Sequence, residues 1–221
     1  MKKLIRGIID FRQNVRASVR ERFAHLALGQ APDTLFVGCS DSRVVPNLFA
    51  STEPGDLFVI RNVGNLVAPK RDGPAVPGGN SVAAAVEFST AVLHVTDIVV
   101  CGHSDCGAMR ALIDPAKRSG LPQIGEWLTH AEPAVARLAA GERLNPALSP
   151  MNNLAQLNVL AQLEHLKTYP VVQAGLAAGS LRLHGWYFDI GGAEVSAYEP
   201  DQNKFVLIDE AEAERILARL E

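Results

Sequence analysis

The feature that most constrains this chain is a set of four short apolar runs, each bounded by turn residues and separated from the next by helical patterns. The runs lie at residues 34–38, 56–62, 97–102 and 181–190. Runs of this length between turn residues are typical of buried strands. Because strands alternate with helices, the pattern predicts βαβ units and an α/β fold with a mostly parallel central sheet flanked by helices.

The helical segments are predicted from their own periodicity and punctuation. A helix is expected at 81–95, a pair of helices within 151–179 divided at Pro170, and a last helix at 209–221, after a hairpin at 193–208. The Pro- and Gly-rich segment 66–80 is expected to be a surface loop. No linker divides the chain, so a single domain over residues 1–221 is the simplest organisation.

The N-terminal segment, residues 1–28, is predicted to be a long helical arm. Its apolar residues recur at spacings of three and four, which is the pattern of one helix face. They are Leu4, Ile8, Phe11, Val15, Val19, Phe23 and Leu26. Arg6 and Asp10 interrupt the apolar part, so the segment is predicted to be a helix and not a signal peptide.

Composition limits the partners and the compartment. The net charge of −3 gives no broad basic surface for nucleic acid. No apolar run approaches the roughly 20 residues that a membrane helix needs. Three cysteines are an odd number and too few for a disulfide scaffold, and two of them have metal-like spacing. The sequence therefore predicts a protein of the reducing cytoplasm, with no nucleic-acid or membrane partner.

Three potential metal ligands lie at the ends of two predicted strands. Cys39 closes the first strand, while His103 follows the third and Cys106 stands three residues further on. In an open parallel sheet, ligands gather at the carboxyl ends of the strands. If these two strands are neighbours, the three side chains meet. Two thiolates and one imidazole suit Zn²⁺, and one ion per subunit is expected.

The fourth coordination position is open. Structural zinc sites are mostly closed by four Cys or His ligands, so a three-ligand set favours a catalytic site. Asp41, water, or each in turn can fill the fourth position. Arg43 offers Asp41 an alternative partner through a bidentate ion pair. The residues alone thus predict a zinc hydrolase or hydratase, because zinc-bound water ionises near neutral pH, and they leave the substrate open.

Four segments, "CSDSR", "PGDLFVIRN", "CGHSDCGAM" and "LHGWYFDI", together resemble β-class carbonic anhydrases, in particular the plant-like branch, over about residues 20–205. The resemblance implies reversible hydration of CO₂ to bicarbonate and a proton by attack of zinc-bound hydroxide. It also implies self-association as a dimer or a larger assembly, with the N-terminal helix extending to the dimer partner.

The resemblance assigns roles residue by residue. Cys39, His103 and Cys106 correspond to the zinc ligands, and Asp41 with Arg43 to the catalytic dyad. The residues that correspond to the substrate pocket are Gln30, Phe58, Val63, Phe88 and Gly107. Phe88 is a departure, since the plant-like pattern has tyrosine there.

Two alternatives remain. Related folds with the same ligands hydrolyse carbonyl sulfide or carbon disulfide, and an inactive, zinc-stabilised structural protein would also keep the ligands. Asp41, Arg43 and Gln30 argue against the structural alternative, because a purely structural site needs none of them.

Overall fold

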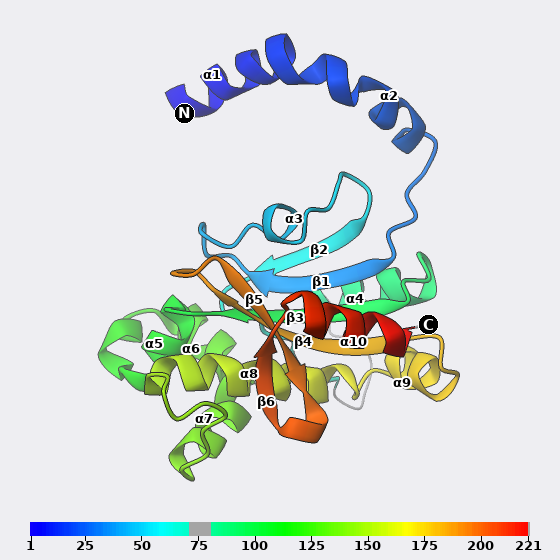
Figure 1. Ribbon diagram of the computed structural model, residues 1–221. Helices are drawn as coiled ribbons and strands as arrows, with labels where there is room; N and C mark the ends of the chain where they lie inside the picture. The colour runs from blue at the N-terminus through cyan, green and yellow to red at the C-terminus, as the bar shows by residue number, and fades with distance from the viewer. Residues whose placement is uncertain (71–80, 221) are drawn as a thin grey trace.

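The computed structural model describes residues 1–70 and 81–220, and its centre is a six-stranded sheet (Figure 1). The strands are β1 (Thr34–Cys39), β2 (Leu57–Asn62), β3 (Asp97–His103), β4 (Arg182–Asp189), β5 (Glu194–Glu199) and β6 (Lys204–Leu207). Their order is β2-β1-β3-β4-β5-β6. The β1–β2, β1–β3 and β3–β4 pairs are parallel, and the last two pairs are antiparallel. The predicted mostly parallel sheet is confirmed, and so is the terminal hairpin.

The helices predicted at 81–95, within 151–179 and at 209–221 are present, the first of them shorter than predicted. The α-helices that follow β1 are α3 (Pro46–Phe49), α4 (Ser81–Ala91), α5 (Gly107–Ile113), α6 (Pro122–Trp127), α7 (Glu132–Ala139), α8 (Pro150–Leu166), α9 (Pro170–Ala177) and α10 (Glu210–Leu220). Of these, α3, α6 and α7 are additional to the prediction. The helix predicted for 81–95 ends at Ala91, because His94 has a φ of 55°, which no α-helix accommodates. Pro170 separates α8 from α9 as expected.

The longest of these helices, α8, packs directly on two glycines of the sheet. Gly102 in β3 and Gly185 in β4 both face Val159 of α8. A Cβ atom at Gly102 would come within 2.8 Å of a Val159 methyl, and one at Gly185 within 3.0 Å. Since a side chain at either position would push the helix away, the two glycines permit the close approach. The polar residues of α8 can therefore reach the loops at the sheet edge.

The segment 66–80 differs from the prediction where the structure describes it. Leu66, Val67 and Ala68 are buried and not on the surface. Two of their backbone groups are hydrogen-bonded to side chains of α8 and of the residue directly before α9. Val67 N–H donates to Gln162 Oε1 at 2.8 Å, and the Tyr169 hydroxyl donates to Ala68 O at 2.7 Å. A loop can be buried when its polar groups are paired in this way. The rest of the prediction, from residue 71, lies outside the described residues.

The N-terminal arm is one continuous helical rod that arches away from the sheet (Figure 1). It consists of α1 (Lys2–Asp10), a π-helical turn (Phe11–Val15) and α2 (Arg16–Leu26). None of its residues is buried within the single chain. Leu4 is 65% exposed and Ile8 is 63% exposed. The predicted apolar face therefore exists, and its own chain leaves most of it exposed: Val19 and Leu26 are partly buried, with Leu26 against Gly55.

Over residues 1–70 and 81–220, the structure contains no helix that is both long enough and apolar enough to cross a membrane.

Candidate metal centre

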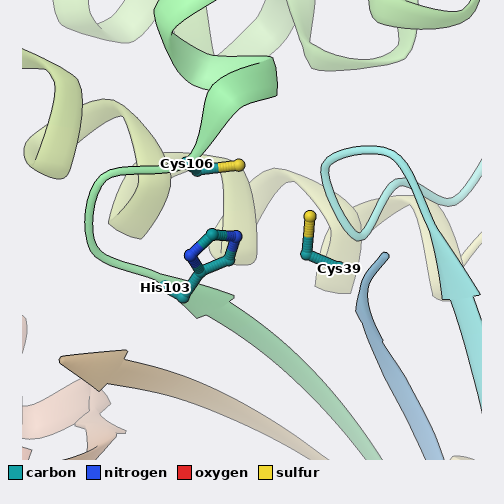
Figure 2. A group of neighbouring side chains, drawn as sticks. All are labelled: Cys39, His103 and Cys106. Atoms are coloured by element: carbon teal, nitrogen blue, oxygen red, sulfur yellow. The ribbon is translucent and has the colours of Figure 1, made fainter. Parts of the chain in front are cut away.

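Cys39, His103 and Cys106 meet at the carboxyl ends of β1 and β3 (Figure 2). One ligand atom from each, two sulfurs and a ring nitrogen, lie within 4.8 Å of one another, and all three residues are buried. The two strands are direct neighbours, as the sequence argument requires. A tight turn brings Cys106 back beside His103. Its central residue, Asp105, has a φ of 55°, so the backbone of the turn is left-handed at that point.

The imidazole of His103 is prepared to bind a cation. Its Nδ1 lies 2.9 Å from Ser104 O. A carbonyl only accepts hydrogen bonds, so Nδ1 carries the proton and Nε2 keeps its lone pair. Nε2 is buried and has no hydrogen-bond partner. Leaving such an atom unpaired costs free energy, and a metal ion is the partner that this geometry fits.

The two sulfurs interact strongly with each other. A hydrogen bond from Cys106 lowers the pKa of Cys39 to about 4, against the opposing effect of burial. The same bond, together with burial, raises the pKa of Cys106. Two sulfurs and one imidazole nitrogen within 4.8 Å of one another are a donor set that fits Zn²⁺.

Asp41 is turned towards Arg43. Arg43 Nε donates to Oδ1 at 2.9 Å, its terminal nitrogen donates to Oδ2 at 2.8 Å, and its backbone N–H donates to Oδ1 at 3.0 Å. The Arg43 side chain therefore holds the pKa of Asp41 well below its usual range. Of the two arrangements that the sequence allowed for Asp41, this conformation has the one on Arg43.

A second carboxylate, which the sequence argument missed, holds Arg43 from its other side. Arg43 donates to Asp105 Oδ2 at 3.2 Å and to Asp105 O at 3.1 Å. Asp105 is also ion-paired to Arg110. The only signal for Asp105 was its place inside "CGHSDCG", because its role depends on the left-handed turn that points it at Arg43.

Two of the predicted pocket residues lie next to the cluster. Val63 follows β2 directly, and its neighbour Gly64 donates its N–H to Cys39 Sγ at 3.4 Å. Gly107 is the first residue of α5 after Cys106. Apart from its chain neighbours and its own helix, no described residue has an atom within 4 Å of the place that a Gly107 Cβ would take, so the start of α5 faces open space.

The other three predicted pocket residues lie at the opposite end of the sheet in the same chain. Phe58 is level with Leu35 at the start of β1, whereas Cys39 is level with Asn62. Four residues of strand, about 13 Å, separate these positions. Phe88 accompanies Phe58, with ring centroids 5.9 Å apart. Gln30 precedes the start of β1. A single chain therefore does not bring Gln30, Phe58 or Phe88 to the cluster.

Comparison with known proteins agrees with this geometry. The family described as "Carbonic anhydrase" matches residues 34–195. A carbonic anhydrase of Pseudomonas aeruginosa is 46% identical over 210 residues, which cover 95% of this chain and 93% of that protein. "Carbonic anhydrase 1" of Escherichia coli O157:H7 is 42% identical over 207 residues, covering 93% of this chain and 91% of its own.

A solved structure extends the agreement to three dimensions. The β-carbonic anhydrase CcaA superposes with a TM-score of 0.86 at 38% identity, and the match covers 94% of this chain and 98% of the other. Taken with the buried Cys39, His103 and Cys106 cluster, these similarities show that the chain belongs to the β-class carbonic anhydrase family.

Proposed function

We propose that this protein is a zinc-dependent carbonic anhydrase that interconverts CO₂ with bicarbonate and a proton. The observation that carries the proposal is the buried cluster of Cys39, His103 and Cys106, which supplies three ligands and leaves a fourth position open. Bound there, zinc supplies a Lewis acid and a hydroxide nucleophile at neutral pH. One zinc ion per subunit would use all three donor atoms.

The residues around the cluster have distinct tasks in this proposal. Arg43 keeps Asp41 away from the fourth position, so that the Asp41 carboxylate is free to accept a hydrogen bond and orient the nucleophile. The Gly107 amide is the candidate donor to a substrate oxygen, because open space lies beside it. Val63 adds an apolar wall, which suits a small molecule with no net dipole.

Gln30, Phe58 and Phe88 join the site only if a second copy delivers them. Within one chain they lie at the far end of the sheet, as the β1–β2 register supports. The exposed apolar face of the arm offers a means of association, because a second copy that covers it removes large side chains such as Leu4 and Ile8 from water. We infer a homodimer or a larger assembly in which each site borrows these three residues.

The decisive experiment is stopped-flow hydration of CO₂ on purified protein, with zinc content measured on the same sample. Hydrolysis of carbonyl sulfide and carbon disulfide is assayed in parallel. We expect stoichiometric zinc and rapid hydration. Zinc-replete protein that is inert to CO₂ and active on a sulfur analogue would transfer the assignment to that alternative. Zinc without any activity would favour the structural alternative.

The cytoplasm is the compartment that we propose. All three cysteines are unbridged, and two must stay reduced to bind metal.

A further inference from the structure

The loop after β2 makes a direct contact with one metal ligand. We call residues 63–68 the β2 loop. Its Gly64 N–H donates to Cys39 Sγ at 3.4 Å. A hydrogen bond from an amide to a thiolate draws negative charge off the sulfur and lowers the electron density that the sulfur gives to a metal. The orientation of this one amide therefore bears on the chemistry of the centre.

The peptide that carries this N–H is fixed at its other end. The Gly64 N–H and the Val63 carbonyl belong to the same planar peptide unit. Trp127 of α6 donates its Nε1–H to Val63 O at 2.8 Å. The indole, the peptide and the Cys39 sulfur thus form a chain of two hydrogen bonds, and each bond polarises the next.

The next carbonyl of the loop is fixed as well. Asn158 of α8 donates its Nδ2–H to Gly64 O at 3.0 Å, and both groups are buried. Asn158 is in turn held by Gln162, whose Nε2–H donates to Asn158 Oδ1 at 2.9 Å. Gly64 has a φ of 84°, and a Cβ there would come within 2.9 Å of Ala108 Cβ in α5. The loop therefore packs closely on α5. Hydrogen bonds from Trp127 of α6 and Asn158 of α8 fix its Val63 and Gly64 carbonyls.

We propose that Trp127 and Asn158 are positioning residues that aim the Gly64 amide at Cys39 Sγ and so limit the charge that this ligand donates to the metal. The hydrogen bonds of both side chains go to the β2 loop and to Gln162, and not to a ligand side chain. The inference rests on the metal site of the proposed function and is independent of which substrate is turned over. The simpler view is that both residues only satisfy the backbone of a buried loop, which would affect stability alone.

The test replaces zinc with cobalt(II), whose thiolate-to-metal charge-transfer absorption reports the electron density at sulfur. Trp127→Phe removes the indole donor and keeps an aromatic ring. Asn158→Leu removes the amide and keeps a similar volume. In both variants we expect the absorption band to move to longer wavelength, because a sulfur without its hydrogen bond gives up an electron more easily. Activity of the zinc forms should fall by about tenfold, the lower end for residues that orient metal ligands.

Asn153→Leu is the matched control. Asn153 is another fully buried asparagine of α8, and it holds a different loop through bonds to Asn145 O and Leu148 O. Its loss should lower thermal stability and leave the cobalt band in place. If Asn158→Leu does not fold, Trp127→Phe still decides, since Trp127 is only partly buried.

The outcomes separate the two proposals. A thiolate band in the parent protein that stays unshifted in the folded, cobalt-loaded variants would overturn the positioning role and leave the metal site standing. A parent protein that takes up no cobalt, or takes it up without a thiolate band, would overturn the metal site and this inference with it.

Discussion

Cys39, Cys101 and Cys106 are all buried, yet they stand in different chemical environments. Cys39 and Cys106 face His103, whereas Cys101 packs in an apolar cluster with Phe36 and Phe188, and burial raises the pKa of its thiol. A buried thiol of this kind stays protonated and inert. The sequence allowed this distinction, because only two of the three cysteines stand at strand ends.

We therefore expect Cys39→Ser and Cys106→Ser to lose bound zinc and CO₂ hydration together, and Cys101→Ser to keep both. Serine is a far weaker zinc ligand than a thiolate, while at position 101 it only exchanges one small buried group for another. Metal analysis after dialysis, followed by stopped-flow hydration, measures both properties. A full equivalent of zinc in both ligand variants would disprove the assignment.

Arg43 is the residue on which the freedom of Asp41 depends. In Arg43→Ala, the carboxylate of Asp41 loses its partner and can take the open coordination position. We expect hydration at neutral pH to fall by more than about tenfold, or roughly 1.4 kcal/mol of barrier, with zinc retained. X-ray absorption spectroscopy of the zinc should detect the added carboxylate oxygen.

Arg110→Ala provides the comparison for Arg43. Arg110 pairs with Asp105, whereas the side chain of Asp41 is held by Arg43. The Arg110→Ala variant should hydrate CO₂ within a few-fold of the parent rate, because it removes only an exposed ion pair. That loss is much smaller than the one expected for Arg43→Ala. Equal activity of zinc-replete Arg43→Ala and the parent would remove Asp41 and Arg43 from the mechanism.

Phe88 stands where the plant-like pattern has tyrosine, so the hydroxyl is absent at this position. The aromatic wall is kept, because the Phe88 ring packs against Phe58. We expect Phe88→Tyr to change hydration by less than about tenfold. Gln30→Ala should cost more, because it removes a polar donor from a mostly apolar pocket. Inertness of the parent towards CO₂, with activity appearing in Phe88→Tyr, would show that the hydroxyl is required.

At the level of single elements, α8 shows where sequence patterns stop being informative. Its helical character and the break before α9 follow from periodicity and Pro170. The burial of Asn153, Asn158 and Gln162 does not, because polar residues on a helix normally indicate a solvated face. Asn153 is buried over the loop directly before α8, where it donates to Asn145 O. Asn158 and Gln162 are buried because their partners, Gly64 O and the Val67 amide, belong to a loop far away in the chain. Such pairings leave no local trace in the sequence.

The starts of β3 and β4 are joined by an ionic cluster around Asp97. Burial raises the pKa of this carboxyl, but hydrogen bonds from Arg182, Thr96 and His184 outweigh burial and hold the pKa well below its ordinary value of 3.8. A carboxyl with a depressed pKa stabilises the fold above its unfolded-state pKa. That stability is lost as the pH falls through the native value.

Acidification from about pH 5 downwards should therefore lower the midpoint of urea unfolding in the parent protein. Asp97→Asn should be less stable at neutral pH and show a shallower decline in acid, so that the two curves converge. Arg182→Gln should behave similarly, since it removes the main partner. Parallel curves for the parent and Asp97→Asn would show that other carboxyls control the acid transition.

At the scale of the whole molecule, the exposed arm and the divided pocket both predict that the active protein is an assembly of at least two copies. Ile8→Glu places a charge on the uncovered apolar face of α1, where a second copy is proposed to pack. Sedimentation should shift towards monomer, and hydration should fall with zinc still bound, because Gln30, Phe58 and Phe88 leave the site. Lys3→Glu is the control for added negative charge and should change neither. Full activity in a zinc-loaded monomer would refute the shared pocket.

The bond between Asn158 and Gly64 joins residues 94 positions apart, and the one between Gln162 and Val67 spans 95. Closing loops of that length is slow, and it is only rewarded once both ends have docked. During synthesis, the cysteine at the end of β1 is made long before the helix that clamps its neighbouring loop. The clamped β2 loop, and with it the fixed hydrogen bond from Gly64 to Cys39, can therefore be complete only after α8 has settled on the sheet.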